Sequence, residues 1–259
     1  MDAEIRSKII KLTSKEPPGS ILLSSWLLRE GYGLSLQRKY KASGWLKSIG
    51  NGAMVRTGSP PHILNAVCAL QQQAKMSVHP AGKSALSLLG LSHDLALSEK
   101  TLMLFSDEKE RLPKWFIDYN WGLEIQHHST NFLKTDIGLS TFSFQGKDIK
   151  VSGPLRAVME CIYLAKNDDD LVTCYQLLEG LNAERPKNVQ SLLEYCQSVK
   201  VLRLFLYMAQ KAGHKWFTYL KIDKNHIRLG RGSRSVQEAK GGIYIPEFQI
   251  IVPRKLYDL

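Results

Sequence analysis

The chain has 259 residues, of which 44% are apolar, so it can fill the core of one large or two ordinary domains and is not expected to be disordered. Its net charge of +11 is uneven: residues 1–58 carry +6, residues 59–150 have no net charge, and residues 151–259 carry +5. Two basic ends can attract nucleic acid, an acidic protein or anionic lipid, and charge alone does not choose among them.

Four cysteines are spread along the chain without a C-x-x-C pair or a zinc-binding spacing: Cys68, Cys161, Cys174 and Cys196. This pattern predicts reduced core thiols in a cytosolic protein. The start of the chain lacks the apolar core of a signal peptide, and no stretch reaches the roughly 18 apolar residues of a membrane span. The sequence therefore predicts a soluble, cytoplasmic protein that does not enter a membrane.

The first 58 residues predict a winged helix-turn-helix. An amphipathic helix over 3–14 is followed by a short extended piece, a helix over 25–30, and a Gly-rich turn over 31–34. A third helix then begins at Leu34 and closes at Gly44, and a strand pair follows that turns at Gly50-Asn51-Gly52. The order helix, helix, turn, helix and hairpin is complete.

The third helix has a basic outer surface. Leu36 and Tyr40 lie four residues apart on the face expected to be buried. The opposite face is expected to present Ser35, Gln37, Arg38 and Lys41, which suits the major groove of DNA, while Lys47 and Arg56 flank a wing beside the backbone. Basic amphipathic helices are also common as solvated surfaces, and the same fold can serve as a protein-binding module.

The rest of the chain predicts an α+β domain. Helices over 62–74 and 82–89 are expected to brace the winged unit, and strands follow at 101–105, 123–128, 139–144 and 149–151. Helices are then expected from Pro154, over 171–179, 186–198 and 201–212, before a tail with extended pieces at 219–220, 243–245 and 248–252. We divide the chain into residues 1–92 and a larger mixed α+β domain, 93–259.

Three patterns that could indicate an enzyme are weak. Gly82-Lys83-Ser84 lacks the Gly that a phosphate loop needs five residues earlier, where Ser77 stands. His127 and His128 are adjacent in a strand and point to opposite faces, and Asp168 to Asp170 suit the start of a helix. No G-x-S-x-G or H-E-x-x-H motif is present. We expect no catalysis, no metal site and no cofactor.

A second concentration of bases follows residue 200. In the helix over 201–212, the stripe of Val201, Leu204, Phe205 and Met208 leaves Lys200, Arg203 and Lys211 at least partly outward. Arg231 and Arg234 lie in a Gly-rich turn further on. These residues form either a binding face or a set of scattered surface charges.

Several segments, in order, resemble a known family. SGWLKSIGNGAMVRTG (43–58), NAVCALQQQ (65–73) and GKSALSLLGLSHDL (82–95) resemble the N-terminal winged-helix domain of AbiEi-type antitoxins. RAVMECIYL (156–164), LLEGL (177–181), RPKNVQSLLEYCQSVKVLRLFLYMA (185–209) and the tail over 229–253 resemble that family's C-terminal domain. The resemblance spans nearly the whole chain.

The resemblance implies the antitoxin of a type IV toxin–antitoxin, or abortive infection, system. The first domain would bind inverted repeats in operator DNA and repress its own operon, and the second would counteract a nucleotidyltransferase-fold toxin. The groove contacts would be Ser35, Gln37, Arg38 and Lys41, the phosphate contacts Lys39, Lys47 and Arg56, and the antitoxin face Lys200, Arg203, Lys211, Arg231 and Arg234. The alternatives are a DNA-binding nuclease or accessory protein of a mobile element, and a winged-helix interaction adaptor.

Overall fold

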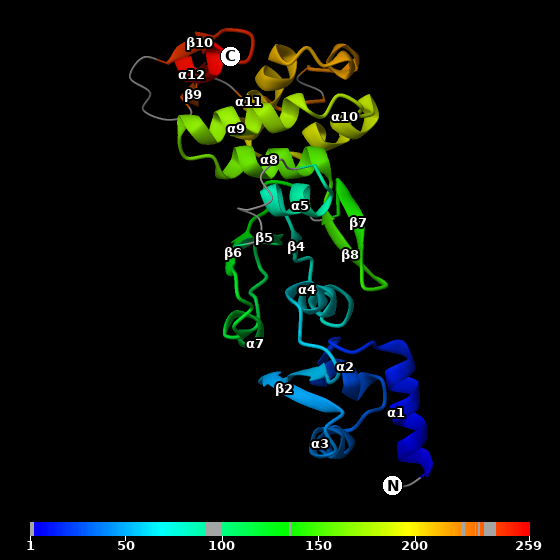
Figure 1. Ribbon diagram of the computed structural model, residues 1–259. Coiled ribbons are helices and arrows are strands. Elements are labelled where there is room, and N and C mark those ends of the chain that lie inside the picture. The colour runs from blue at the N-terminus through cyan, green and yellow to red at the C-terminus, as the bar shows by residue number, and fades with distance from the viewer. Residues whose placement is uncertain are drawn as a thin grey trace.

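The computed structural model describes residues 3–91, 100–134, 136–223, 226–230, 232, 234–235 and 242–259. The molecule is elongated, with the N-terminal elements at one end and a cluster of helices at the other (Figure 1). Buried side chains form two separate apolar clusters, a small one near the N-terminus and a large one that continues through the rest of the chain. The small cluster lies within the winged unit, whereas the large one fills the larger mixed body and also includes Ile21, Leu23, Ala53 and Val55 from the wing sheet.

The winged unit has the predicted order of elements. Its elements are α1 (Ala3–Lys15), β1 (Ile21–Leu23), α2 (Ser24–Arg29), α3 (Leu34–Ala42), β2 (Leu46–Gly50) and β3 (Ala53–Arg56). The strands form an antiparallel sheet in the order β1-β3-β2, so β2 is an edge strand. The small cluster holds the helices on the sheet with Ile9, Leu12, Leu22, Leu27, Tyr32, Tyr40, Leu46 and Met54.

The next elements connect the winged unit to the larger body. They are α4 (Ile63–Gln72), β4 (His79–Pro80) and α5 (Gly82–Leu88). We expected both helices to brace the winged unit. Helix α4 does contact it, through β1, while also contacting β8, whereas α5 packs mainly on α8 and β5. Every residue of α4 from Ile63 to Leu70 is buried because the helix is covered from both directions. The expected domain boundary, between 92 and 93, lies outside the described residues.

The larger body contains two small sheets. Its elements here are β5 (Thr101–Ser106), α7 (Lys114–Ile117), β6 (Glu124–Ser129), β7 (Leu139–Phe144) and β8 (Lys147–Ser152). The first sheet has the order β4-β5-β6, with β5 and β6 parallel, and β7 and β8 form an antiparallel hairpin. All four expected strands are present, whereas the short helix α7 was not expected.

A helical layer and a short tail complete the fold. They comprise α8 (Pro154–Leu164), α9 (Asp168–Glu179), α10 (Pro186–Tyr195), α11 (Val199–Lys211), the 3₁₀ helix η1 (Lys215–Tyr219), β9 (Arg234–Ser235), β10 (Ile243–Ile245), β11 (Ile250–Val252) and α12 (Arg254–Tyr257). The chain at Tyr219 was expected to be extended, but it ends the 3₁₀ helix, where Trp216 is buried. The α+β class with a winged N-terminal unit is confirmed.

A buried carboxylate ties the centre of the body together. Glu160 on α8 accepts hydrogen bonds from Ser152 Oγ and Arg156 Nε, both at 2.8 Å, and from the backbone N–H of Gly82 at 2.9 Å. His79 Nε2 lies 3.6 Å from its Oε1. The anion at the start of α5 is thus an internal side chain, which explains Gly82-Lys83-Ser84 without a phosphate.

The other polar motifs also have structural roles. Asp170 lies in the first turn of α9, where its N–H bonds the side chain of Asn167, and Asp169 forms an ion pair with Lys255. In the part of the chain that the structure describes, no group of three His, Cys, Asp or Glu could hold a metal ion, and no helix is long and apolar enough to cross a membrane. All four cysteines are buried and free.

Candidate nucleic-acid interface

Helix α3 presents a basic face on the outside of the winged unit. Tyr40 is buried and Leu36 is half-buried against the small core, which fixes the rotation of the helix. The exposed polar side chains are Ser35, Arg38, Lys39 and Lys41. Their placement agrees with the amphipathic pattern, and it leaves three positive charges free of the protein core.

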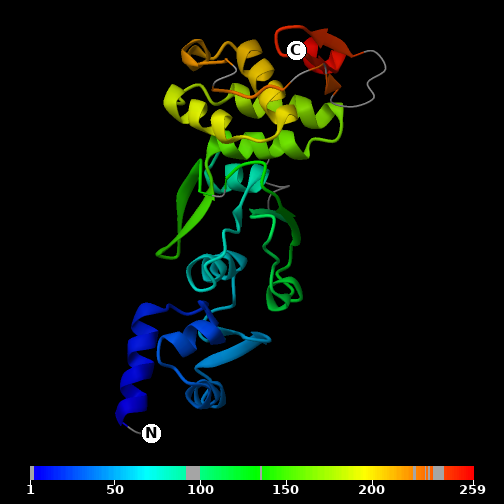
Figure 2. The same cartoon turned by 180° about the vertical axis from the view of Figure 1, so that it is seen from behind.

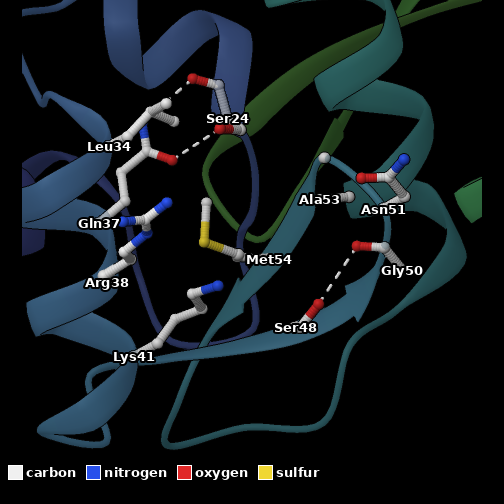
Figure 3. A pocket seen from close by; sticks show the side chains of 11 residues that line it. Ser24, Leu34, Gln37, Arg38, Lys41, Ser48, Gly50, Asn51, Ala53 and Met54 are labelled. Carbon is white, nitrogen blue, oxygen red and sulfur yellow. Dashed lines mark hydrogen bonds between the residues drawn. The ribbon is translucent and has the colours of Figure 1, made fainter.

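A cleft lies between α3 and the β2–β3 hairpin. Its volume is about 190 Å³, and Arg38 and Lys41 extend into it from the helix side (Figure 3). The hairpin side is formed by Ser48, Gly50, Asn51, Gly52, Ala53 and Met54. The cleft is thus basic on one wall and has backbone and small polar groups on the other, an arrangement suited to an anionic polymer.

Leu34 is a cleft residue that we did not expect. It is the first residue of α3 and is 52% exposed, one helical turn before Arg38. An exposed apolar side chain beside an arginine can contact the methyl group of thymine while the guanidinium group of the arginine bonds guanine. The i and i+4 spacing of Leu34 and Arg38 on one helix is the signal in the sequence that could have indicated this role.

Gln37 corrects our expectation for the outer face. It is only 3% exposed, and its amide donates to the carbonyls of Ser24 and Tyr32, at 3.2 and 2.8 Å. Its Oε1 accepts from Ser24 Oγ at 2.7 Å (Figure 3). Gln37 therefore joins α3 to α2, because these backbone groups at the helix-turn-helix junction need a partner. It is among the residues that line the cleft, but both N–H groups of its amide are used within the protein.

The two basic residues of the hairpin, Lys47 and Arg56, differ in exposure and in their contacts. Lys47 on β2 is exposed. Arg56 at the end of β3 is half-buried, and its Nη1 donates to the carbonyls of Thr13 and Glu16 near the end of α1. Arg56 therefore links the wing sheet to the end of α1, and its phosphate contact remains a prediction, whereas Lys47 is exposed on the wing.

The basic residues expected on an antitoxin face also need correction. Arg203 is fully buried, and its guanidinium donates to the carbonyls of Leu229, Gly232 and Gln249 at 2.9, 2.7 and 2.6 Å. It holds the tail on α11, where all residues from Val201 to Ala209 are buried because the tail covers the face that the helix alone would leave open. It therefore cannot contact a partner.

The other members of that face are only partly exposed or not described. Lys200 Nζ donates to the carbonyl of Ala165 at 2.9 Å, and burial lowers its pKa. Lys211 Nζ donates to the carbonyl of Tyr257 at 2.7 Å. Arg231 lies outside the described residues, and Arg234 belongs to β9, paired with β11. Exposed bases at this end of the molecule include Lys187, Lys215 and Lys221.

Two family models cover nearly the whole chain. The model described as "Transcriptional regulator, AbiEi antitoxin N-terminal domain" matches residues 5–97. The model described as "Transcriptional regulator, AbiEi antitoxin, Type IV TA system" matches residues 99–253. The two matches follow each other in the order of the winged unit and the larger body.

A solved structure shares this arrangement. The crystal structure of the RV2827C protein from Mycobacterium tuberculosis matches with a TM-score of 0.56 and 12% sequence identity, covering 100% of this chain and 95% of that one. At this identity the likeness concerns the fold. No curated protein matches the sequence. On the family matches, the chain belongs to the AbiEi antitoxin family, the transcriptional regulators of type IV toxin–antitoxin systems.

Proposed function

We propose that the winged unit binds inverted repeats in the promoter of its own operon and represses it, and that the larger body counteracts a cognate nucleotidyltransferase-fold toxin. The observation that supports the DNA proposal best is the cleft, where Leu34, Arg38 and Lys41 on α3 face the hairpin and remain exposed. Leu34, Arg38 and Lys41 contact base edges, and Lys39 and Lys47 hold the phosphate backbone. Ser35 is a further groove contact.

Arg38→Ala tests the base-reading role. Loss of one base contact costs about 1–3 kcal/mol of discrimination, so affinity for the promoter should fall by roughly fivefold to 150-fold while affinity for unrelated DNA changes little. Fluorescence anisotropy with labelled duplexes of both kinds measures this. Lys187→Ala, an exposed base at the far end of the molecule, is the matched control and should leave both affinities unchanged. Equal losses on both duplexes with Arg38→Ala would refute groove reading by α3.

Lys47→Ala tests the wing. A phosphate contact carries no sequence information, so both duplexes should lose affinity alike, and the slope of log K against log salt should decrease in magnitude by about 1. A change confined to the promoter duplex would show that Lys47 reads a base instead. If the wild-type protein binds no DNA even at low salt, the winged fold serves protein contacts and the proposal fails.

The toxin proposal rests on family membership and can be tested separately from repression. A strain that carries the cognate toxin should grow when this protein is supplied from an unrelated promoter. Arg38→Ala should still protect it, because the toxin is counteracted by the larger body, although a reporter behind the native promoter should be derepressed. If Arg38→Ala loses protection at equal protein level, DNA binding and antitoxicity are not divided between the two parts.

A further inference from the structure

The wing of this protein is held by an element of the larger body. Helix α7 lies beside β2 in both views of the molecule (Figures 1 and 2). A Cβ placed on Gly50 would lie 2.7 Å from Trp115 Cβ and 3.0 Å from Trp115 Cα. The two backbones therefore approach as closely as a glycine allows, at the point where β2 enters its turn.

Helix α7 is itself firmly anchored. Trp115 is 6% exposed and Phe116 is fully buried, with their ring centroids 5.7 Å apart. The ring of Trp121 lies 5.7 Å from Phe116, and its Nε1 donates to the Phe116 carbonyl at 2.7 Å. Because these side chains belong to the core of the larger body, α7 can transmit the position of that body to the hairpin.

The hairpin needs such support. Strand β2 lies at the edge of its sheet, with β3 as its one partner, and the register shifts between Ser48 and Gly50. An edge strand with a bulge bends more readily than a regular central strand. Trp115 meets β2 at this irregular position, next to the turn that forms one wall of the cleft.

A second contact between the winged unit and the larger body prevents the winged unit from rotating about the contact between Gly50 and Trp115. The tip of the β7–β8 hairpin reaches the winged side of the molecule, where Lys147 forms an ion pair with Glu16. Asn65 Nδ2 donates to Gln145 Oε1 and to the carbonyl of Gly19, both at 3.1 Å. The winged unit is thus held at two places, at the wing and in the segment that follows α1.

We propose that Trp115 is a positioning residue for DNA binding: through Gly50 it holds the wing where Lys47 meets the DNA backbone, so the DNA-binding unit includes residues on both sides of the family-domain division. This inference rests on the proposed DNA-binding function. Trp115 touches no DNA itself. Removing the Trp115 side chain should therefore weaken DNA binding in the same way as removing the Lys47 side chain. The contacts of α3 with the DNA bases should remain.

A double-mutant cycle tests this inference. We expect Lys47→Ala to weaken promoter binding roughly threefold to tenfold and to reduce the magnitude of the salt slope by about 1. Trp115→Ala should do the same, and the double variant should be no weaker than either single variant. Additive losses, or full affinity and an unchanged slope for Trp115→Ala, would overturn the inference. If Trp115→Ala acted only by lowering the stability of the protein, Lys47→Ala would still weaken promoter binding by the same factor in the Trp115→Ala variant.

Two further variants keep the test valid if Trp115→Ala does not fold, which circular dichroism would reveal. Gly50→Ala adds a Cβ that clashes with Trp115 from the wing side, and it should reduce the contribution of Lys47 to promoter affinity in the same way. If Lys47→Ala weakens binding as much in the Gly50→Ala variant as in the wild type, the inference is contradicted. Ile117→Ala, on the same helix but 56% exposed, is the control and should bind as the wild type does. Absence of any wild-type binding would refute the proposed function, whereas wild-type binding with additive Lys47 and Trp115 effects would refute only the positioning role.

Discussion

Single polar side chains decide how both ends of this molecule are assembled. Gln37 bonds two carbonyls and a hydroxyl at the helix-turn-helix junction, and Arg203 bonds three carbonyls of the tail. Both stand at positions where helical periodicity alone indicates an outward side chain. Periodicity ranks positions by the apolar face of one helix and contains no information about neighbouring segments that later cover the polar face.

Gln37→Ala should destabilise the winged unit. It removes three hydrogen bonds and leaves buried backbone carbonyls unpaired, which costs about 1–3 kcal/mol. Thermal denaturation followed by circular dichroism measures the loss. Ser35→Ala, one exposed position in the same helix, serves as the control and should change the free energy of unfolding by less than about 0.5 kcal/mol. An unchanged melting curve for Gln37→Ala would mean that the junction is held by other contacts.

Arg203→Ala should destabilise the larger body more strongly. The variant leaves three buried carbonyls without their charged donor, with an expected loss of about 3–5 kcal/mol. Urea denaturation would detect it, and Lys215→Ala, an exposed base nearby in sequence, should behave as the wild type does. Loss of toxin protection by Arg203→Ala with undiminished stability would contradict a structural role and restore Arg203 to a binding face.

Local sequence patterns determine some helices and strands of this fold, whereas other elements depend on contacts with distant segments. The strands of the body and the wing hairpin could be predicted because alternation and Gly turns mark them directly. Helix α7 has four residues and no periodicity, so its existence depends on the burial of Trp115 and Phe116 against distant segments. The role of α5 as a partner of α8 depends likewise on Glu160, which lies 78 residues beyond Gly82 in the chain.

The cluster around Glu160 predicts a pH dependence of stability. Burial raises the pKa of this carboxyl, but the interaction with His79, the charge of Arg156 and the Gly82 N–H outweigh burial and hold the pKa below its ordinary value of 4.5. The unfolded chain therefore binds this proton more readily than the folded one. The stabilisation is complete above pH 4.5 and is lost as pH falls below 4.5 through the folded pKa.

Glu160→Gln should remove this contribution. The amide keeps the shape but leaves the buried guanidinium of Arg156 uncompensated, so the free energy of unfolding at pH 7 should fall by about 3–5 kcal/mol. The further loss on acidification below pH 4.5 should also be smaller than in the wild type. Urea denaturation at pH 7 and pH 4 compares the two proteins. A variant that loses stability with acid as steeply as the wild type would place the titrating group elsewhere.

The winged unit joins the larger body through α4, the β7–β8 hairpin, the contact of α7 with the wing, and a wing-sheet face that belongs to the large core (Figure 1). The class of the fold and its winged N-terminal unit could be predicted from the order of local patterns. The exposed basic residues of α3 could be predicted from the same patterns. The position of Leu34 and Asn51 in the cleft and the support of the wing by Trp115 depend on how distant segments meet in space. Such long-range contacts leave little trace in a single sequence.

Helix α3 and the wing are proposed to bind promoter DNA by sequence. The most direct measurement is the affinity of the wild-type protein, at one fixed salt concentration of about 150 mM, for its own promoter and for the same fragment with the repeats scrambled. Specific sites are typically bound on the order of 10³-fold or more tightly than unrelated DNA, and the promoter should show a preference of that order. Equal affinity for the two fragments would contradict the account.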